Sequence, residues 1–443
     1  MPLYCFCSSY RHRQIYGLDT ITMRTQHTLK LARSIGFKAF KPDQLTFLVL
    51  FCFCSLGLVI TTAFGNRSFF LGFLTAILFI GYVFFQRKMK IGYLVGLLII
   101  FTLSLALFFK LGSSQGRLLI YKVSFDIFKD HWLMGLGFAE FKRSYLAYQA
   151  NYFAKGNYTA QELLLADNTY FVFNDYWQFV LEWGLGAVVI IVGLAYLCFL
   201  AIGKTWYVIR SRPFLMCSVC SLLILATAAL FTHVFEKWYW QLVFWSSFVT
   251  LTSTLLPKLG LQFKLTAYLL VFSSVLLFHI DQLKSWRYAA DLRDAEELVL
   301  MGYQEEGLEA FVRLSQLRAD DRFLFAYAQA CASSGNLTKA VKLYQSIAAR
   351  SNSICLRIAE LYRELNDPRA ESWYKLAVDM VPNRFNTRKA LFNYYIAQKD
   401  YTKAQIIGLV TLRLPIKIPS AVVDRIRSEV STSLDQISKF NHL

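Results

Sequence analysis

The 443-residue chain is 56% hydrophobic and only 17% charged, whereas ordinary globular proteins average about 45–50% and 25%. Residues 1–284 hold 25 Lys and Arg against 11 Asp and Glu, and residues 285–443 hold 22 against 18. The front is thus about 13% charged and the tail about 25%, which excludes a purely soluble protein. Most of the net charge of +18 lies in the front, which argues against nucleic acid as a partner and for basic loops that set membrane topology.

Residues 1–44 are basic and polar, without the apolar centre of a secretory signal. We expect this segment in the cytoplasm, with sorting directed by the first spanning helix. Residues 45–110 contain three stretches that are long enough to cross a bilayer. Their boundaries are the charged residues Asp43, Arg67, Arg87, Lys90 and Lys110.

Residues 111–177 are expected to form a long periplasmic loop, and residues 178–284 to hold four further spanning helices. The weakest of these helices is 265–280, which spans only if Lys264 and Asp281 lie at the two interfaces. With seven spans, the Lys- and Arg-rich connections all fall on one side, so the tail is expected to be periplasmic. Nine cysteines are scattered without a disulfide framework, and Cys217-x-x-Cys220 is interpreted as core packing.

The tail, residues 285–443, shows recurring small residues at a period of about 30. Ala310, Ala340, Ala370 and Ala404 take corresponding places, and Pro382 follows the third unit. These stretches resemble degenerate tetratricopeptide repeats, in which small residues let paired helices approach. Such an array is either a surface for a periplasmic protein partner or a structural cap. The fold class is therefore all-α: a polytopic membrane bundle of about seven helices, followed by a helical repeat domain.

Two arginines fall on the expected periplasmic side, where each is either a headgroup anchor or part of an anion clamp. Arg67 begins the second span and Arg117 opens the loop. A helix that begins near Asn174 would carry Asp175, Gln178 and Glu182 on one polar stripe. A carboxylate stripe near hydrocarbon must face protein or water, so the stripe predicts a cavity wall or an ion pair with an arginine.

The order of Asn66-Arg67-Ser68, Arg117 through Phe128, HWLMGLGFAEF and FNDYWQFVLEWGLG resembles the O-antigen ligase family over roughly residues 45–255. The resemblance implies a metal-independent, cofactor-free transfer of a glycan from an undecaprenyl-diphosphate carrier. The acceptor would be lipid A core or another glycan acceptor at the periplasmic face of the bacterial inner membrane. Arg67 and Arg117 would hold the diphosphate, and the lipid bilayer is the surrounding partner.

The sequence departs from this family where a histidine usually precedes the asparagine, because Phe173 stands there. The proton acceptor would then be Asp175, Glu182 or Asp167, or a histidine brought from elsewhere, His131 or His233, and Asp175 is preferred. Asn174, Gln178, Glu182, Asp167 and His131 are expected to contact the substrate.

Seven spans are fewer than the ten or more that the family generally has, which predicts a truncated or internal start before Leu45. Two alternatives stay open: an O-antigen polymerase of the same class, and an inactive or truncated membrane-anchored repeat scaffold.

Overall fold

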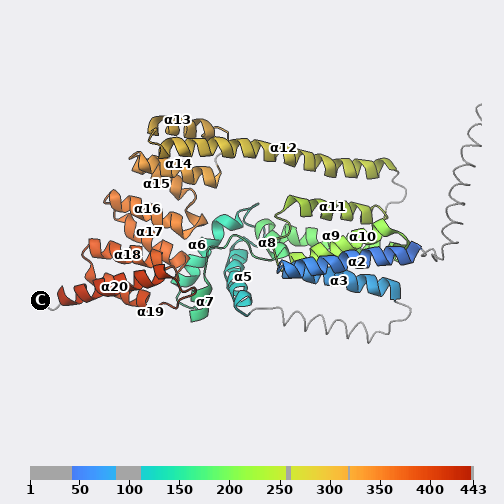
Figure 1. Cartoon of the computed structure of the whole chain (residues 1–443), viewed down its shortest axis with the longest axis horizontal. Helices are drawn as coiled ribbons and strands as arrows, with labels where there is room; N and C mark the ends of the chain where they lie inside the picture. The colour runs from blue at the N-terminus through green and yellow to red at the C-terminus, as the bar shows by residue number, and fades with distance from the viewer. Residues whose placement is uncertain (1–41, 86–110, 256–260, 318–319, 441–443) are drawn as a thin grey trace, which may run out of the picture.

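The computed structural model describes residues 42–85, 111–255, 261–317 and 320–440, and every element within them is helical. Figure 1 shows an elongated molecule with a helix bundle at one side and the tail at the other, joined by α5 to α8 and by the long α12. The predicted all-α architecture is confirmed for these residues. The bundle comprises α2 (Pro42–Ala63), α3 (Arg67–Phe85), α9 (Leu185–Thr205), η1 (Ile209–Ser211), α10 (Pro213–Ala229) and α11 (Trp238–Thr252).

Small residues bring α3 and α10 into close contact inside the bundle. A Cβ on Gly72 would lie 2.6 Å from the carbonyl oxygen of Ile224, so only glycine fits at this approach. The hydroxyls of Thr75 and Thr227 are 3.2 Å apart across the same interface. Small side chains and cross-helix hydroxyl contacts are how helices pack in lipid, where exclusion of water drives little association.

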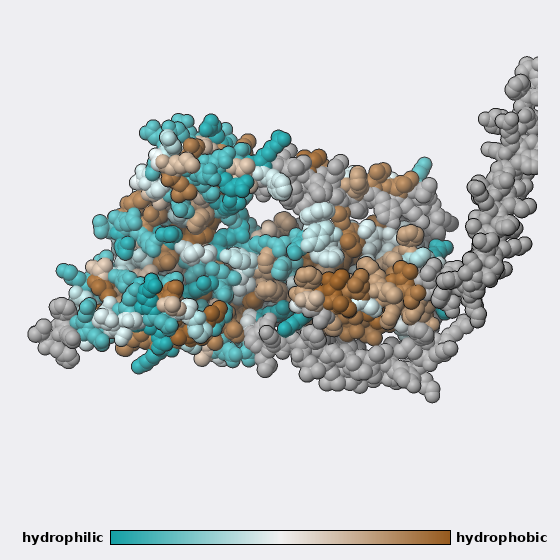
Figure 2. All heavy atoms as spheres, in the orientation of Figure 1, coloured by the Kyte–Doolittle hydropathy of each residue, from teal (hydrophilic) through white to brown (hydrophobic). Residues whose placement is uncertain are grey.

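Two of the described helices are long and apolar enough to cross a membrane, Arg67–Phe84 and Leu185–Thr205. Phe47–Thr61 and Pro213–Ala229 are shorter apolar helices. The predicted span at 90–110 lies outside the described residues. The expectation of about seven spans is therefore supported only in part, although Figure 2 shows apolar surface gathered over the bundle and polar surface over the tail.

The weakest predicted span, 265–280, belongs to α12 (Leu261–Leu300), a single 40-residue helix that packs beside α11 and then continues into the tail. The expected domain boundary between residues 284 and 285 thus falls inside a helix. No proline or glycine interrupts the sequence there, so nothing stops the helix at the change in composition.

The two ends of the bundle differ. One end holds Lys204, Arg210 and the start of α10, and the Arg210 guanidinium lies 5.1 Å from the ring centre of Phe84. The other end holds the start of α3, the turn between α10 and α11, and α8 (Asp175–Trp183). Among the described residues, the basic connection 204–212 and the predicted loop motif therefore lie at opposite ends of the bundle.

The tail is a row of helices in which each one packs on the next. Its elements after α12 are α13 (Gln304–Ser315), α14 (Asp321–Ser333), α15 (Leu337–Gln345), η2 (Ala348–Arg350), α16 (Asn352–Glu364), α17 (Arg369–Met380), α18 (Phe385–Ala397), α19 (Tyr401–Arg413) and α20 (Ala421–Phe440). Three of the recurring alanines, Ala340, Ala370 and Ala404, are fully buried or nearly so. Small residues at these positions therefore permit the close helix packing that the repeat pattern predicts.

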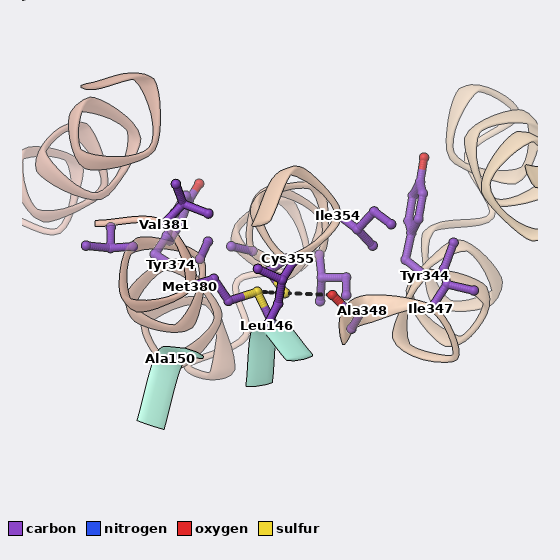
Figure 3. Packing of buried hydrophobic residues seen from close by; sticks show 14 of the residues in the cluster. Leu146, Ala150, Tyr344, Ile347, Ala348, Ile354, Cys355, Tyr374, Met380 and Val381 are labelled. Carbon is purple, nitrogen blue, oxygen red and sulfur yellow. Dashed lines mark hydrogen bonds between the residues drawn. The ribbon is translucent and has the colours of Figure 1, made fainter. Parts of the chain in front are cut away.

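The loop at 111–177 does not stand apart from this tail. Its helices are α5 (Leu111–His131), α6 (Phe141–Ala154) and α7 (Ala160–Leu165), and the buried residues of α5 and α6 belong to the same hydrophobic core as α12 to α20. Figure 3 shows Leu146 and Ala150 of α6 beneath Cys355 and Met380 of the tail. The bundle has a separate core.

Polar groups fix α6 on the tail. The amide nitrogen of the fully buried Gln149 donates to the carbonyl oxygens of Met380, at 2.5 Å, and Asp167. Asn383 donates to the carbonyl oxygens of Leu164 and Ala166 at 2.6 and 2.9 Å. Because a buried carbonyl without a donor is costly, these amides hold the loop in one position against the repeats.

We expect Gln149→Ala to lower the free energy of unfolding by about 1–3 kcal/mol, since it leaves two carbonyl groups without this donor. Gln405→Ala removes an amide from an exposed position on α19 and should change stability by less than about 0.5 kcal/mol. Thermal unfolding of the detergent-solubilised variants measures the difference. Equal midpoints for the two variants would refute this role of Gln149.

Candidate functional site

The start of α8 is set by two neighbouring residues. Asn174 caps the helix, and its side-chain oxygen accepts the backbone N–H of Trp177 at 3.0 Å. Phe173 precedes it with a φ of +58°, in the left-handed region that a bulky side chain rarely adopts. The Trp177 indole N–H donates to the buried hydroxyl of Ser124 at 2.9 Å, which holds α8 on α5. The predicted helix start near Asn174 therefore agrees with the structure.

Asp175 ties this helix start to the bundle. Its Oδ2 accepts the backbone N–H groups of Val234 and Phe235, at 2.6 and 3.1 Å, in the turn between α10 and α11. Burial raises the pKa of Asp175 to about 6, although the two hydrogen bonds favour the ionised form. The carboxylate thus joins segments about 60 residues apart in sequence.

The same turn places His233 beside the predicted motif. Its imidazole stacks on Phe171, with ring centres 4.2 Å apart, and meets the ring of Phe173 edge-on at 5.9 Å. Its Nδ1 is buried and, among the described residues, has no hydrogen-bond partner, while Nε2 lies 3.9 Å from the Glu236 carboxylate. Burial lowers the pKa of His233 below its usual value, so the ring is neutral at pH 7 and able to accept a proton.

Two cations border these aromatic rings. The Arg117 guanidinium lies 5.4 Å from the ring centre of Phe173, and the Lys142 ammonium lies 4.4 Å from that of Phe171. Lys142 also pairs with Glu236 at 2.8 Å. The side chains of Arg117, Phe171, Phe173, Asp175 and His233, together with Lys142 and Glu236, are called the seam site below, because they lie where the bundle meets the loop.

The residues of the predicted polar stripe contact two different parts of the protein. Gln178 donates to Oε1 of the buried Glu182 at 3.2 Å, and Oε2 of Glu182 accepts the backbone N–H of Ala139 at 3.2 Å. Burial raises the pKa of Glu182. Glu182 therefore holds the loop 132–140 against the end of α8, whereas Asp175 faces the α10–α11 turn.

Three other predicted site residues lie apart from the contacts of the seam site. Asp167 pairs with Arg384 at 2.6 Å and with Lys417 at 3.5 Å. Burial opposes its ionisation, but hydrogen bonds from Arg384 and the Asn168 backbone hold the pKa of Asp167 below its usual value, so it is a weak base. His131 is exposed at the end of α5, and Arg67 is exposed at the first residue of α3.

Arg67 nevertheless lies at the same end of the bundle as the seam site. Phe69, on the first turn of α3, packs against Trp240 with ring centres 4.7 Å apart, and Trp240 follows the turn that carries His233. The convergence of Arg67 with Arg117 on one anion stays a prediction.

A cavity of about 580 Å³ opens elsewhere in the loop, between α5 and α6. Asp126, Lys129 and Asp130 of α5 line it, with Tyr148, Asn151 and Lys155 of α6. None of the seam-site residues borders it. We place the candidate chemistry at the seam site because a cation, a half-buried carboxylate and an imidazole lie there.

Sequence reasoning missed the contacts that Phe171, Lys142 and Glu236 make. His233 was one of two histidine alternatives, and nothing near it in sequence indicates that it lies beside Phe173. The available signal was the polar HVFEKW turn between two apolar stretches. Its significance depends on which loop it packs against, and that is a tertiary property.

At this site a polar and aromatic loop packs against one end of a helix bundle, and two of the bundle's described helices are long and apolar enough to cross a membrane. The family model described as O-antigen ligase matches residues 49–192, which is less than half of the chain. The match includes Arg67, Arg117 and all of α8, and it supports in general terms a membrane glycosyltransferase of the ligase or polymerase type. No curated protein matches this chain.

We expect Gly184→Ala to lower stability, since Gly184 has a φ of +59° and a Cβ there would lie 2.3 Å from the Leu133 carbonyl oxygen. Backbone strain alone should cost about 1–3 kcal/mol. Gly186→Ala, two residues later in α9 with open space around it, should be neutral or stabilise by up to about 1 kcal/mol. Unfolding midpoints in detergent compare the two, and similar midpoints would show that the close approach is not rigid.

Proposed function

We propose that the chain is an O-antigen ligase-like glycosyltransferase that moves a glycan from an undecaprenyl-diphosphate carrier to lipid A core or another acceptor. The match to residues 49–192 supports the class. The single observation that carries the proposal is the meeting of Arg117, Phe173 and His233 at one end of the bundle. In this proposal that end is periplasmic, the N-terminus is cytoplasmic and the membrane is the bacterial inner membrane.

Arg117 is the proposed diphosphate ligand. A guanidinium offers paired N–H donors that match two phosphate oxygens, and it stays charged at any physiological pH. Its contact with the Phe173 ring fixes the direction of the group, so its donors are already oriented when negative charge develops on the leaving diphosphate. Fixed donors of this kind contribute several kcal/mol to a transition state. Arg67 is proposed as the second ligand, from the start of α3.

His233 is the proposed proton acceptor in place of the missing histidine at position 173. A neutral imidazole with a lowered pKa can take the proton of an acceptor hydroxyl at pH 7. Asp175, the preferred base from sequence alone, is instead assigned to positioning. Its Oδ2 is already engaged by two backbone N–H groups, and these hold the turn that carries His233.

Asn174, Gln178 and Glu182 are assigned to holding α8 and the 132–140 loop, because their hydrogen bonds go to the protein itself. Asp167 is assigned to fixing the loop on the tail. His131 lies at the exposed end of α5 and keeps its proposed role as a substrate contact.

Arg117→Ala should abolish glycan attachment, with a loss of about 10²–10³ in rate. Arg210→Ala is the matched control, because this arginine also lies over a phenylalanine ring but at the opposite end of the bundle. Gel analysis of cell-envelope glycans in complemented cells measures attachment. Normal attachment with Arg117→Ala, in protein that folds and reaches the membrane, would contradict the proposal.

His233→Gln should reduce turnover by about 10²–10⁴, as expected for loss of a general base. Asp175→Asn should keep most of the activity, because the amide oxygen can still accept the backbone N–H groups of the turn. Initial rates of the purified variants, with a lipid-linked donor in detergent, separate the two roles. The reverse pattern would identify Asp175 as the base.

The pH dependence of stability checks the environment of Asp175 independently. Since its folded pKa is raised to about 6, the folded protein keeps a proton that the unfolded chain has lost, and stability falls as pH rises from about 4 to about 6. The stability of Asp175→Asn does not depend on this proton. Its free energy of unfolding, relative to that of the wild type, should therefore rise by on the order of 2 kcal/mol between pH 4 and pH 7. Unfolding midpoints across this range measure the gain, and a difference that does not change with pH would show that the carboxyl is not buried.

Two other readings remain testable with the same variants. A polymerase of this class would leave single repeat units attached when inactive, which a glycan gel distinguishes from complete loss. A membrane-anchored scaffold would tolerate Arg117→Ala and depend on the tail, which we propose to be a degenerate tetratricopeptide-like array that displays a surface to a periplasmic partner. Because α6 and the tail share one hydrophobic core, we propose that the main role of the tail is to hold the catalytic loop in place rather than to bind a partner.

A further inference from the structure

The segment 132–138 exposes several large apolar side chains. Met134 and Phe138 are 82% and 78% exposed, and Trp132 and Leu133 are half exposed. Trp183, at the end of α8, and Leu185, at the start of α9, are also about half exposed. An exposed apolar group of this size in a loop marks an interaction surface.

The backbone of this segment is held rigidly. Leu136 N–H donates to the Leu181 carbonyl at 2.9 Å, Gly137 N–H to that of Glu182 at 2.9 Å, and Leu185 N–H to that of Leu133 at 3.2 Å. Gly135 and Gly184 both have positive φ and lie so close to the opposing backbone that a Cβ on either would be 2.3 Å from a carbonyl oxygen. The exposure is therefore a fixed property of the loop.

These contacts also fix where the loop lies. It is bonded to the last turn of α8 and the first residue of α9, so it sits at the point where the apolar helix Leu185–Thr205 begins. The outer faces of α9 are exposed along its length, including Val189, Val192 and Phe199. A helix of this length and hydropathy with exposed apolar faces has lipid as its surroundings. The exposed loop is continuous with that lipid-facing surface.

We infer that residues 132–138, with Trp183 and Leu185, form a membrane-inserted rim that enters the lipid leaflet at the seam-site end of the bundle. Trp132 and Trp183 lie at the level where tryptophan is enriched in membrane proteins, between headgroups and acyl chains. Met134 and Phe138 enter the apolar side of that boundary, as the apolar side chains of interfacial segments do. Through the hydrogen bonds to α8, the rim sets the height of the seam site above the membrane.

The inference requires that the chain spans a membrane, and it does not require that the chain is a transferase. A nitroxide carried on p-acetylphenylalanine, which leaves the native cysteines unlabelled, tests it. The label replaces Met134 or Phe138 in the full chain, reconstituted in phosphatidylethanolamine and phosphatidylglycerol nanodiscs. Matched labels at Val189 on α9 and at Gln398, an exposed residue of the tail, serve as lipid and water references.

Collision rates with oxygen, which concentrates in lipid, and with a water-soluble nickel chelate are compared at each position. The oxygen-to-nickel ratio at 134 and 138 should approach that at 189 and exceed that at 398 several-fold. Ratios equal to that at 398 would overturn the inference, since the loop would then lie in water. Exclusion of both reagents at 134 and 138 would also overturn it, because a second copy or a protein partner would cover the loop.

Discussion

One half-buried carboxylate joins the two halves of this protein. Asp175 accepts two backbone N–H groups from the turn between α10 and α11, while the loop that carries it shares its hydrophobic core with the tail. Tyr176 adds a hydrogen bond to the Ala226 carbonyl at 3.0 Å, and Lys142 pairs with Glu236 across the same boundary. Because polar contacts at the edge of a membrane are costly to leave unmade, this junction fixes the loop on the bundle and brings His233 against Phe171 and Phe173.

The tail supports the loop 111–177, a role that its composition did not predict. Helix α6 is buried against α17 and η2, so the tail packs against one side of the loop. Asp175 holds the loop on the bundle through the turn between α10 and α11. Helix α12 runs from the bundle into the tail without a break, and makes a second connection between the two. A loop held on both sides keeps its functional groups within the narrow tolerances that a preorganised site requires.

Local signals in the sequence predicted much of this. A helix that begins near Asn174 was expected from the sequence, and Ala340, Ala370 and Ala404, which recur at a period of about 30, are buried. Helix α12 runs through the expected boundary at residue 284, because a change in composition does not end a helix. The partner of Asp175 and the position of His233 were beyond sequence reasoning, since both depend on contacts between segments about 60 residues apart.

In the proposed function, Arg117 of the seam site binds a lipid-linked diphosphate, with Arg67 as the second ligand. Native mass spectrometry of the purified protein with undecaprenyl diphosphate tests this without requiring the sugar or the acceptor. We expect a one-to-one adduct with the wild type and with Arg210→Ala, and at least a tenfold weaker adduct with Arg117→Ala, which is about 1.4 kcal/mol of binding free energy. Equal adducts in all three proteins would contradict the account.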